Sequence, residues 1–341
     1  MKERNYSFDL MRVLACLMII SMHAPMPSEN ANPLFLNASG YFTAPGLCLF
    51  FVISGALLLP IKTDTFSFLK KRLCKVVMPT LCFTLLYLML GAANGTEVNW
   101  AKSICSIPFS PQGHGVLWFM YTLIGLYLVS PIISRWLDKA SKREEEFYLT
   151  LWVITMCYPL LKLVLEVNES NTGILYYFSG YLGYFVLGHY LNKYLETLTL
   201  RRLILPVALA VAVPVACKLL HLEVDFYSLF WYLSIFVTIL TVAIYVVISK
   251  YGQKLVGGGK LRSFVVLTSN LSFAIYLIHI AVMRSFLWKL DCIIIIDNYI
   301  LQWAVIVMLT FAISWCIAYA MSLLPFGDYI IGFKRQRQRQ R

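Results

Sequence analysis

The sequence predicts an all-α polytopic membrane protein of about ten transmembrane helices, with its N- and C-termini in the cytoplasm. Three observations predict this fold class: an apolar composition, ten long apolar runs, and an uneven distribution of Lys and Arg. Hydrophobic residues make up 60% of the 341 residues and charged residues only 13%, and the mean hydropathy is +0.72. Soluble domains contain roughly 45–50% apolar and about 25% charged residues. The composition therefore excludes a soluble globular protein.

The apolar runs have lengths near the roughly 20 residues that cross a hydrocarbon core of about 30 Å. Each run is expected to be a helix, because backbone polar groups in lipid must be satisfied within their own segment. In chain order, the expected spans are 8–23, 41–60, 76–93, 116–134, 148–165, 174–191, 203–220, 229–249, 264–283 and 301–323. We expect one transmembrane domain over residues 1–333 and a polybasic cytoplasmic tail over 334–341.

The positions of the basic residues predict the orientation. If the N-terminus is cytoplasmic, the inner connections hold most of the 29 Lys and Arg residues. The outer connections and outer helix ends hold only Lys102, Lys162, Lys218, Arg284 and Lys289. This is the positive-inside pattern of a multi-pass membrane protein. Topology and anionic lipid headgroups account for the net charge of +12 without a nucleic-acid partner.

The first expected helix carries three ionisable residues, Asp9, Arg12 and His23. Such groups cost at least about 2.5–3.5 kcal/mol within a span and are functional candidates by default. Arg12 and His23 share one face of a straight helix, about 16 Å apart along its axis. Asp9 and Arg12 are at i, i+3 and can pair. Two plainer interpretations stay open: Arg12 reaches the inner headgroups, and His23 is an ordinary interfacial residue.

Six segments, in order along nearly the whole chain, resemble the acyltransferase-3 family of membrane O-acyltransferases. Arg12 and His23 match the family's basic residue, ten intervening residues and His. FFVISG, with Ser54, is similar to FF-x-x-SG, and FLKKRLCKVVMP is similar to Arg-x-x-Arg-Ile-x-Pro. The remaining segments are LWFMYTLIGLYLVSPII, a Gly-rich helix ending in LGHYL, and SNLSFAIYLIH. The chain most resembles the branch that contains the enterobacterial common antigen O-acetyltransferase.

The resemblance implies an acyl-CoA-dependent enzyme of the bacterial inner membrane, with acetyl-CoA as the donor and no metal. Its acceptor is implied to be a hydroxyl of a cell-surface or lipid-linked glycan on the outer side. The residues expected on the donor side are Arg12, Ser54, Lys70, Lys71, Arg72 and Lys75. Their cationic cluster suits the phosphates of coenzyme A, although positive-inside topology also explains it. Lys75 stands where the family has Arg, which weakens a bidentate phosphate contact.

His23 is expected to be the general base, because an imidazole with a pKa near 6.5 is largely neutral at neutral pH. A covalent acyl-imidazole is the other route, and the sequence does not separate the two. Asp9 is expected to orient Arg12. Unranked candidates for the oxyanion donor are Ser54, Trp118, Tyr121 and Asn270. The residues expected on the acceptor side are His114, Trp118, Tyr121, Asn270 and His279.

Two other classes of protein remain as alternatives. A secondary transporter, or a flippase for a lipid-linked glycan, also has about ten spans and buried charges. It would predict an inverted repeat and discontinuous helices, and the sequence displays neither pattern. A non-catalytic receptor or scaffold would give Arg12 and His23 no role beyond packing. The sequence leaves the oligomeric state open.

Overall fold

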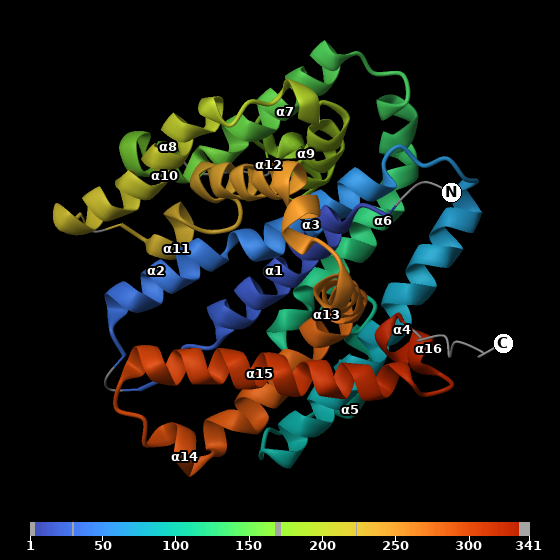
Figure 1. Ribbon diagram of the computed structural model, residues 1–341, viewed down its shortest axis with the longest axis vertical. Helices are drawn as coiled ribbons and strands as arrows, with labels where there is room; N and C mark the ends of the chain where they lie inside the picture. The colour runs from blue at the N-terminus through green and yellow to red at the C-terminus, as the bar shows by residue number, and fades with distance from the viewer. Residues whose placement is uncertain (1–3, 29–30, 168–171, 223, 334–341) are drawn as a thin grey trace. The chain divides into compact units, whose positions relative to one another are not determined.

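The structure is a computed structural model that describes residues 4–28, 31–167, 172–222 and 224–333 (Figure 1). These residues form helices and connecting segments, with no strand among them, which confirms the prediction of an all-α protein. The predicted polybasic tail, 334–341, lies outside the described residues. The chain forms two compact units. The first comprises Met1–Met22, Asn32–Pro60 and Ile132–Ser269, and the second comprises His23–Ala31, Ile61–Pro131 and Asn270–Arg341.

The described residues contain eight helices that are long and apolar enough to cross a membrane, or nine if one bent pair counts as a span. The bent pair is α7 (Lys142–Met156) and α8 (Tyr158–Leu165), which meet at 45°. Pro159 lies in the first turn of α8. A proline has no N–H to donate and its ring clashes with the carbonyl four residues earlier, here that of Thr155, so α7 cannot continue through it. The prediction of a multi-pass membrane protein is confirmed at this coarser level.

The predicted span 174–191 is much shorter in the structure. It contains a single 3-10 turn at Tyr176–Phe178 and the helix α9 (Leu182–Lys193), which has 12 residues. A helix of that length covers only about 18 Å. Gly180 has a φ of +87°, outside the right-handed helical region, so the helix cannot extend back through it.

The first unit packs around α3 (Pro45–Leu58) and α9. Its further helices are α1 (Tyr6–His23, of which His23 falls in the second unit), α2 (Pro33–Thr43), α10 (Arg201–Leu219), α11 (Phe226–Leu229) and α12 (Ile235–Val256), with a 3-10 turn at Leu195–Thr197. Gly55 of α3 and Gly188 of α9 let the two backbones approach closely. A Cβ at Gly55 would lie 1.8 Å from the Phe185 carbonyl oxygen, and one at Gly188 would lie 1.9 Å from that of Val52. Small residues allow this kind of helix packing in membranes.

The second unit contains α4 (Thr65–Ala93), α5 (Trp100–Ser106), α14 (Asp291–Ile294), α15 (Tyr299–Ser322) and α16 (Gly327–Ile331), with 3-10 turns at Gly115–Leu117 and Leu287–Lys289. Two longer helices, α6 (Trp118–Leu137) and α13 (Gly259–Ser285), contribute residues to both units. The short α16 packs against α4 and α15, in red beside cyan in Figure 1.

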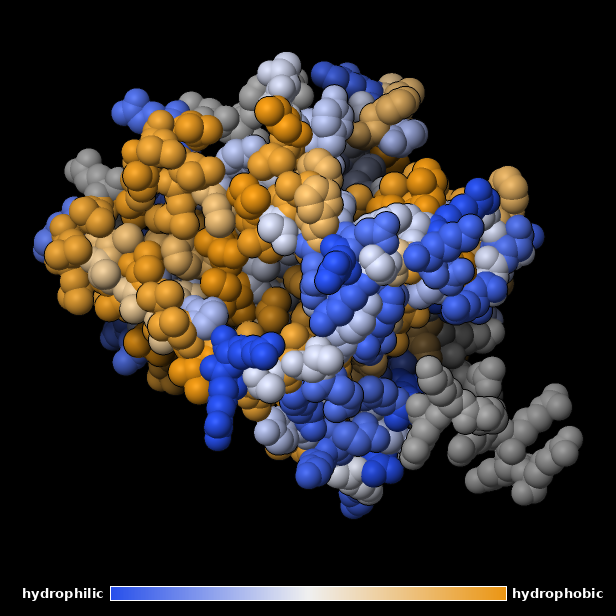
Figure 2. Space-filling view, turned by 90° about the horizontal axis from the view of Figure 1, so that it is seen from above, coloured by the Kyte–Doolittle hydropathy of each residue, from blue (hydrophilic) through white to orange (hydrophobic). Residues whose placement is uncertain are grey.

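The surface carries extended hydrophobic areas, as expected for contact with lipid. In the view of Figure 2, hydrophobic side chains form a broad continuous area and hydrophilic side chains gather apart from it. Helix α10 illustrates the reason: Ala210 is its only buried residue, and Ile204, Leu205 and Leu209 are largely exposed. A helix that is apolar yet exposed needs lipid around it.

Candidate active site

The predicted site residues fall into two groups, and each group is described within its own unit. The first unit holds Asp9, Arg12 and Ser54. The second unit holds His23, Lys70, Lys71, Arg72, Lys75, His114, Trp118, Tyr121, Asn270 and His279. Helix α1 runs unbroken from Tyr6 to His23, so Arg12 and His23 share one helix, as the sequence predicts.

Asp9 is the centre of a charged cluster in the first unit. Its carboxylate is only 2% exposed. Arg4 binds both of its oxygens, with Nε and one terminal nitrogen each 2.7 Å away, and Ser269 donates a hydrogen bond of 2.6 Å. The Arg12 guanidinium lies 3.9 Å from the same carboxylate. A buried carboxylate needs such partners because an unpaired buried charge is very costly.

Arg4 therefore takes the close bidentate position at Asp9, and Arg12 makes only the longer contact. Bidentate pairs of this kind are the stronger ones. The sequence pairs Asp9 with Arg12 by helical spacing, but that spacing does not detect Arg4, which precedes the helix. Asp9 thus holds two guanidinium groups together, and Arg12 is the one on the helix itself.

His23 and His279 come together in the second unit. Their ring centroids are 5.3 Å apart, with the planes inclined at 57°. His23 is half-buried at the end of α1, and His279 is fully buried on α13. Of all the sequence-predicted candidates, these are the two imidazoles that the fold places side by side. Two rings at this spacing can share a proton directly or through one small group.

The neighbours of His279 fix its tautomer. The Nδ1 atom contacts the backbone carbonyl oxygen of Tyr276. A carbonyl only accepts, so Nδ1 carries the hydrogen and Nε2 of the neutral ring is an acceptor. The buried Nε2 receives no hydrogen bond from any described residue. His279 therefore presents an unprotonated, hydrogen-bond-accepting nitrogen in a buried position.

Two tyrosine hydroxyls hold the helix that carries His279. Tyr276 donates to the carbonyl oxygen of Val116 at 2.6 Å, and Tyr87 of α4 donates to that of Leu277 at 2.7 Å. Both tyrosines are buried. Satisfied buried hydrogen bonds position a site rigidly.

His114 lies beside Arg284, a residue that the sequence analysis counts only as an outer charge. The Nδ1 atom of His114 accepts from the Val116 N–H at 3.1 Å, and Nε2 lies 3.3 Å from the Arg284 guanidinium. Both partners donate, yet a neutral imidazole accepts at only one nitrogen. The shorter contact, from the Val116 N–H to Nδ1, is the better hydrogen bond. The Arg284 guanidinium can therefore donate to an acceptor other than His114.

Burial first, and the Arg284 charge second, lower the pKa of His114 below its usual value. The other side of the guanidinium lies over the Trp288 ring, with 5.2 Å to its centroid. Arg284 follows His279 by five positions on the same helix. The expected span 264–283 ends one residue before Arg284, whereas α13 continues to Ser285, so the cost of a charge within a span does not single Arg284 out in the sequence.

The sequence places the cationic cluster in the connection before the expected span 76–93. This prediction is wrong, because the cluster lies on the helix α4. Asp64 caps α4 by accepting from the Ser67 N–H at 3.0 Å, and the helix continues through all four basic residues. Lys70, Lys71 and Lys75 are exposed and Arg72 is half-buried. A capped start explains why the helix begins before the predicted span.

The remaining candidates are less available than the sequence predicts. The Ser54 hydroxyl donates to the Phe50 carbonyl of its own helix at 2.7 Å. The Tyr121 hydroxyl donates to the Ile107 carbonyl at 2.6 Å and so braces an adjoining connection. Trp118 begins α6, and Asn270 lies within α13; both are half-buried.

Comparison with known families identifies the chain. An acyltransferase-3 family described as "Acyltransferase domain" matches residues 5–319. The comparisons with curated proteins and with solved structures each gave no match. The family match covers nearly the whole chain and favours an acyltransferase over the transporter or flippase alternative. With its apolar helices, the chain therefore belongs to the acyltransferase-3 family of membrane acyltransferases.

Proposed function

We propose that the protein transfers an acetyl group from cytoplasmic acetyl-CoA to a hydroxyl of a glycan on the outer side of a bacterial inner membrane. The single observation that carries this proposal is the His23–His279 pair, with ring centroids 5.3 Å apart. Both termini are cytoplasmic in this scheme, in keeping with the distribution of Lys and Arg. The acceptor is a cell-surface polysaccharide or a lipid-linked sugar, in line with the resemblance to the common-antigen branch.

The donor enters from the cytoplasmic side in this proposal. Its phosphates meet Lys70, Lys71, Arg72 and Lys75 on the first turns of α4. The three lysines are exposed and Arg72 is half-buried, and these positions suit charge-assisted contacts. Arg12 stands on the inner half of α1 and guides the donor toward the membrane. From Arg12, α1 continues to His23 over about 16 Å, a length comparable with an extended pantetheine arm.

His23 acts as the general base in the simpler route. The acceptor hydroxyl oxygen attacks the thioester carbonyl, the new C–O bond forms and the C–S bond breaks. The imidazole takes the hydroxyl proton and then returns it to the departing coenzyme A thiolate. In the other route an imidazole nitrogen attacks the thioester carbonyl, the C–S bond breaks, and the departing coenzyme A thiolate takes the imidazole N–H proton. The sugar hydroxyl then attacks the acetyl-imidazole, the C–N bond breaks, and the imidazole takes the hydroxyl proton. In either route, Nε2 of the neighbouring His279 can accept a hydrogen bond from the His23 ring and so orient it.

The oxyanion formed in each route needs a hydrogen-bond donor. Ser54 and Tyr121 are weaker candidates, because each hydroxyl hydrogen already goes to a backbone carbonyl. Trp118 and Asn270 carry N–H groups and lie in the same unit as the imidazole pair. We keep Trp118 and Asn270 among the candidates because they share the unit of the imidazole pair.

Transfer of labelled acetyl from acetyl-CoA to glycan in membrane vesicles tests the proposal. His23→Ala is expected to lower the rate by about 10²–10⁴-fold, the usual contribution of a general base. His221→Ala is the control, because His221 is an exposed residue of the first unit and should leave the rate unchanged. Transfer at the wild-type rate in His23→Ala would falsify the assignment. Acetylated His23 in acid-quenched protein would select the covalent route.

A further inference from the structure

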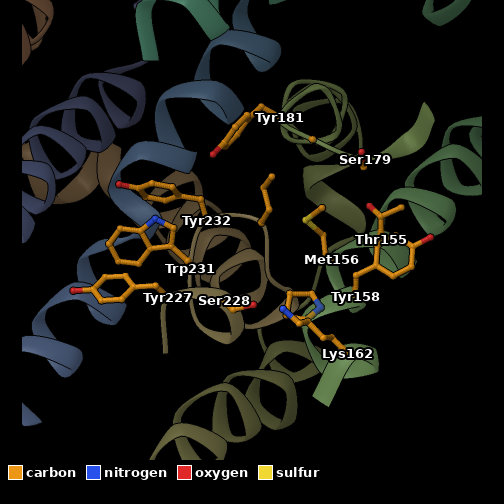
Figure 3. Close-up of a pocket in the computed structure, with 13 residues that line it drawn as sticks. Thr155, Met156, Tyr158, Lys162, Ser179, Tyr181, Tyr227, Ser228, Trp231 and Tyr232 are labelled. Atoms are coloured by element: carbon orange, nitrogen blue, oxygen red, sulfur yellow. The ribbon is translucent and has the colours of Figure 1, made fainter. Parts of the chain in front are cut away.

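The first unit contains a cavity of about 400 Å³ that the proposed chemistry does not use. Three parts of the chain line it: the break between α7 and α8 with the start of α8, the segment before α9, and α11 with the segment that joins it to α12 (Figure 3). Its volume falls within the range of about 300–1,000 Å³ that is typical of small-molecule sites.

Aromatic rings form one wall of this cavity. Figure 3 shows Tyr227, Trp231 and Tyr232 along one side, with Thr155, Met156 and Tyr158 on the opposite side. The Trp231 centroid is 4.9 Å from that of Tyr227 and 4.7 Å from that of Tyr232. An aromatic face is electron-rich, so it attracts the partly positive C–H face of a pyranose ring.

The polar atoms of the lining include both acceptors and donors of hydrogen bonds. The Thr155 hydroxyl donates to the Trp152 carbonyl at 2.6 Å, and the Ser179 hydroxyl donates to the Tyr176 carbonyl at 2.8 Å, so each offers its lone pairs to a ligand. Lys162, the cation of the lining, only donates. A polyol, whose hydroxyls both donate and accept, matches both kinds of group.

Hydrogen bonds fix the backbone around the cavity. The Trp152 indole N–H donates to the Gly180 carbonyl at 2.9 Å, and the Tyr184 hydroxyl donates to the Tyr232 carbonyl. Gly180, at a φ of +87°, makes the turn between the 3-10 turn and α9. A site that is already formed loses less entropy on binding.

The cavity lies at the C-terminal end of α7 and at the N-terminal ends of α9 and α12. The opposite ends of these three helices carry Lys142, Lys193 and Lys254. By the positive-inside rule those ends are cytoplasmic. The cavity then opens on the outer side, where the acceptor is expected.

We propose that this cavity binds a pyranose unit of the acceptor glycan, stacked on Trp231 and in edge contact with Tyr227, whose ring is inclined at 71° to that of Trp231. The hydroxyls of the sugar donate to Thr155 and Ser179 and accept from Lys162. The inference rests on the proposed function, which supplies the glycan as the acceptor class. The competing explanation is an ordinary interfacial belt of Tyr and Trp, which binds no sugar.

Saturation-transfer NMR on the purified protein in lipid nanodiscs, which carry no sugar headgroup, tests the inference. The probes are the methyl pyranosides of glucose, galactose, N-acetylglucosamine and glucuronic acid. At least one is expected to receive saturation at its ring C–H protons. Tyr227→Ala and Trp231→Ala should each raise the Kd of that probe by up to about tenfold. An aromatic contact contributes roughly 0.5–1.5 kcal/mol beyond the burial of its surface area.

Tyr177→Ala is the matched control. Tyr177 is 83% exposed and Tyr227 is 60% exposed, both lie in connections of the first unit, and only Tyr227 lines the cavity. The control should bind the probe as the wild type does. Saturation of no probe, or equal Kd values in Tyr227→Ala and Tyr177→Ala, overturns the inference.

The variant His23→Ala separates this inference from the proposed function. If it loses acetyl transfer and still binds the pyranoside, both proposals stand. Acetyl transfer by a wild-type protein that binds no probe overturns the cavity alone. Probe binding that depends on Trp231, in a protein whose His23→Ala variant transfers acetyl normally, overturns the catalytic assignment alone.

Discussion

At the scale of single residues, the Arg284 charge lowers the pKa of His114, second to burial. Burial and this charge both lower the pKa of His114. Removing the charge makes the protonated imidazole less unfavourable, so Arg284→Gln is expected to raise the pKa of His114, while burial still holds it below its usual value. Ring signals of His114 in an NMR pH titration, assigned with His114→Gln, measure the change.

Arg262→Gln is the control for this titration. Arg262 lies on the same helix, α13, and stacks on Tyr6 with 4.7 Å to the ring centroid. Its loss should leave the pKa of His114 where it is. A pKa of His114 that falls or stays constant in Arg284→Gln would contradict the electrostatic account.

Spacing and motifs in the sequence identify candidate site residues, but they do not predict the partners of those residues. Helical spacing finds Asp9 and Arg12, and the motif ending in His279 supplies the second imidazole. The close contact of Asp9 with Arg4 depends on how the chain enters α1, which no periodicity records. The pairing of His23 with His279 depends on packing between elements that are distant in sequence.

At the scale of elements, the contact between α3 and α9 makes a stability prediction. A Cβ at Gly55 would lie 1.8 Å from a backbone oxygen, which cannot move aside as a side chain can. Gly55→Ala is therefore expected to lower the Tm by about 3–10 °C through overpacking. Thermal unfolding of the purified protein in detergent measures the shift.

Gly125→Ala provides a comparison for Gly55→Ala. Gly125 also lies within a helix, α6, and a Cβ there would meet nothing within 4 Å. Alanine has a higher helix propensity than glycine, so this Tm should stay constant or rise. Equal Tm values for the two variants would show that the close approach of α3 and α9 is not required.

Apolar length predicts most of the long helices, yet it misplaces two elements for physical reasons. Helix α4 begins at Thr65, eleven residues before the expected span 76–93. The Asp64 side chain accepts from an N–H of its first turn, so the helix can start outside the apolar run. The segment 174–191 is apolar enough for a span, but Gly180 interrupts it. Apolar runs predict burial in lipid or protein, and cap and turn residues decide where a helix begins.

At the scale of the whole molecule, the proposed function depends on orientation, because it places the donor and the acceptor on opposite sides of the membrane. The uneven distribution of Lys and Arg predicts this orientation without any knowledge of packing. Fold class is predictable from composition for the same reason: lipid imposes helices on every span. The division into two compact units leaves no signal in composition, because it depends on contacts between distant segments.

Exposed cysteines allow the orientation to be measured. Cys74, on α4, and Cys105, on α5, are both exposed, and the positive-inside pattern assigns them to the inner and outer sides. In single-cysteine variants, a membrane-impermeant thiol reagent should label Cys105 in intact cells. It should label Cys74 only after permeabilisation, because a charged reagent does not cross the hydrocarbon core. Labelling of Cys74 in intact cells would place the cationic cluster on the wrong side for cytoplasmic acetyl-CoA, and the proposed direction of transfer would fail.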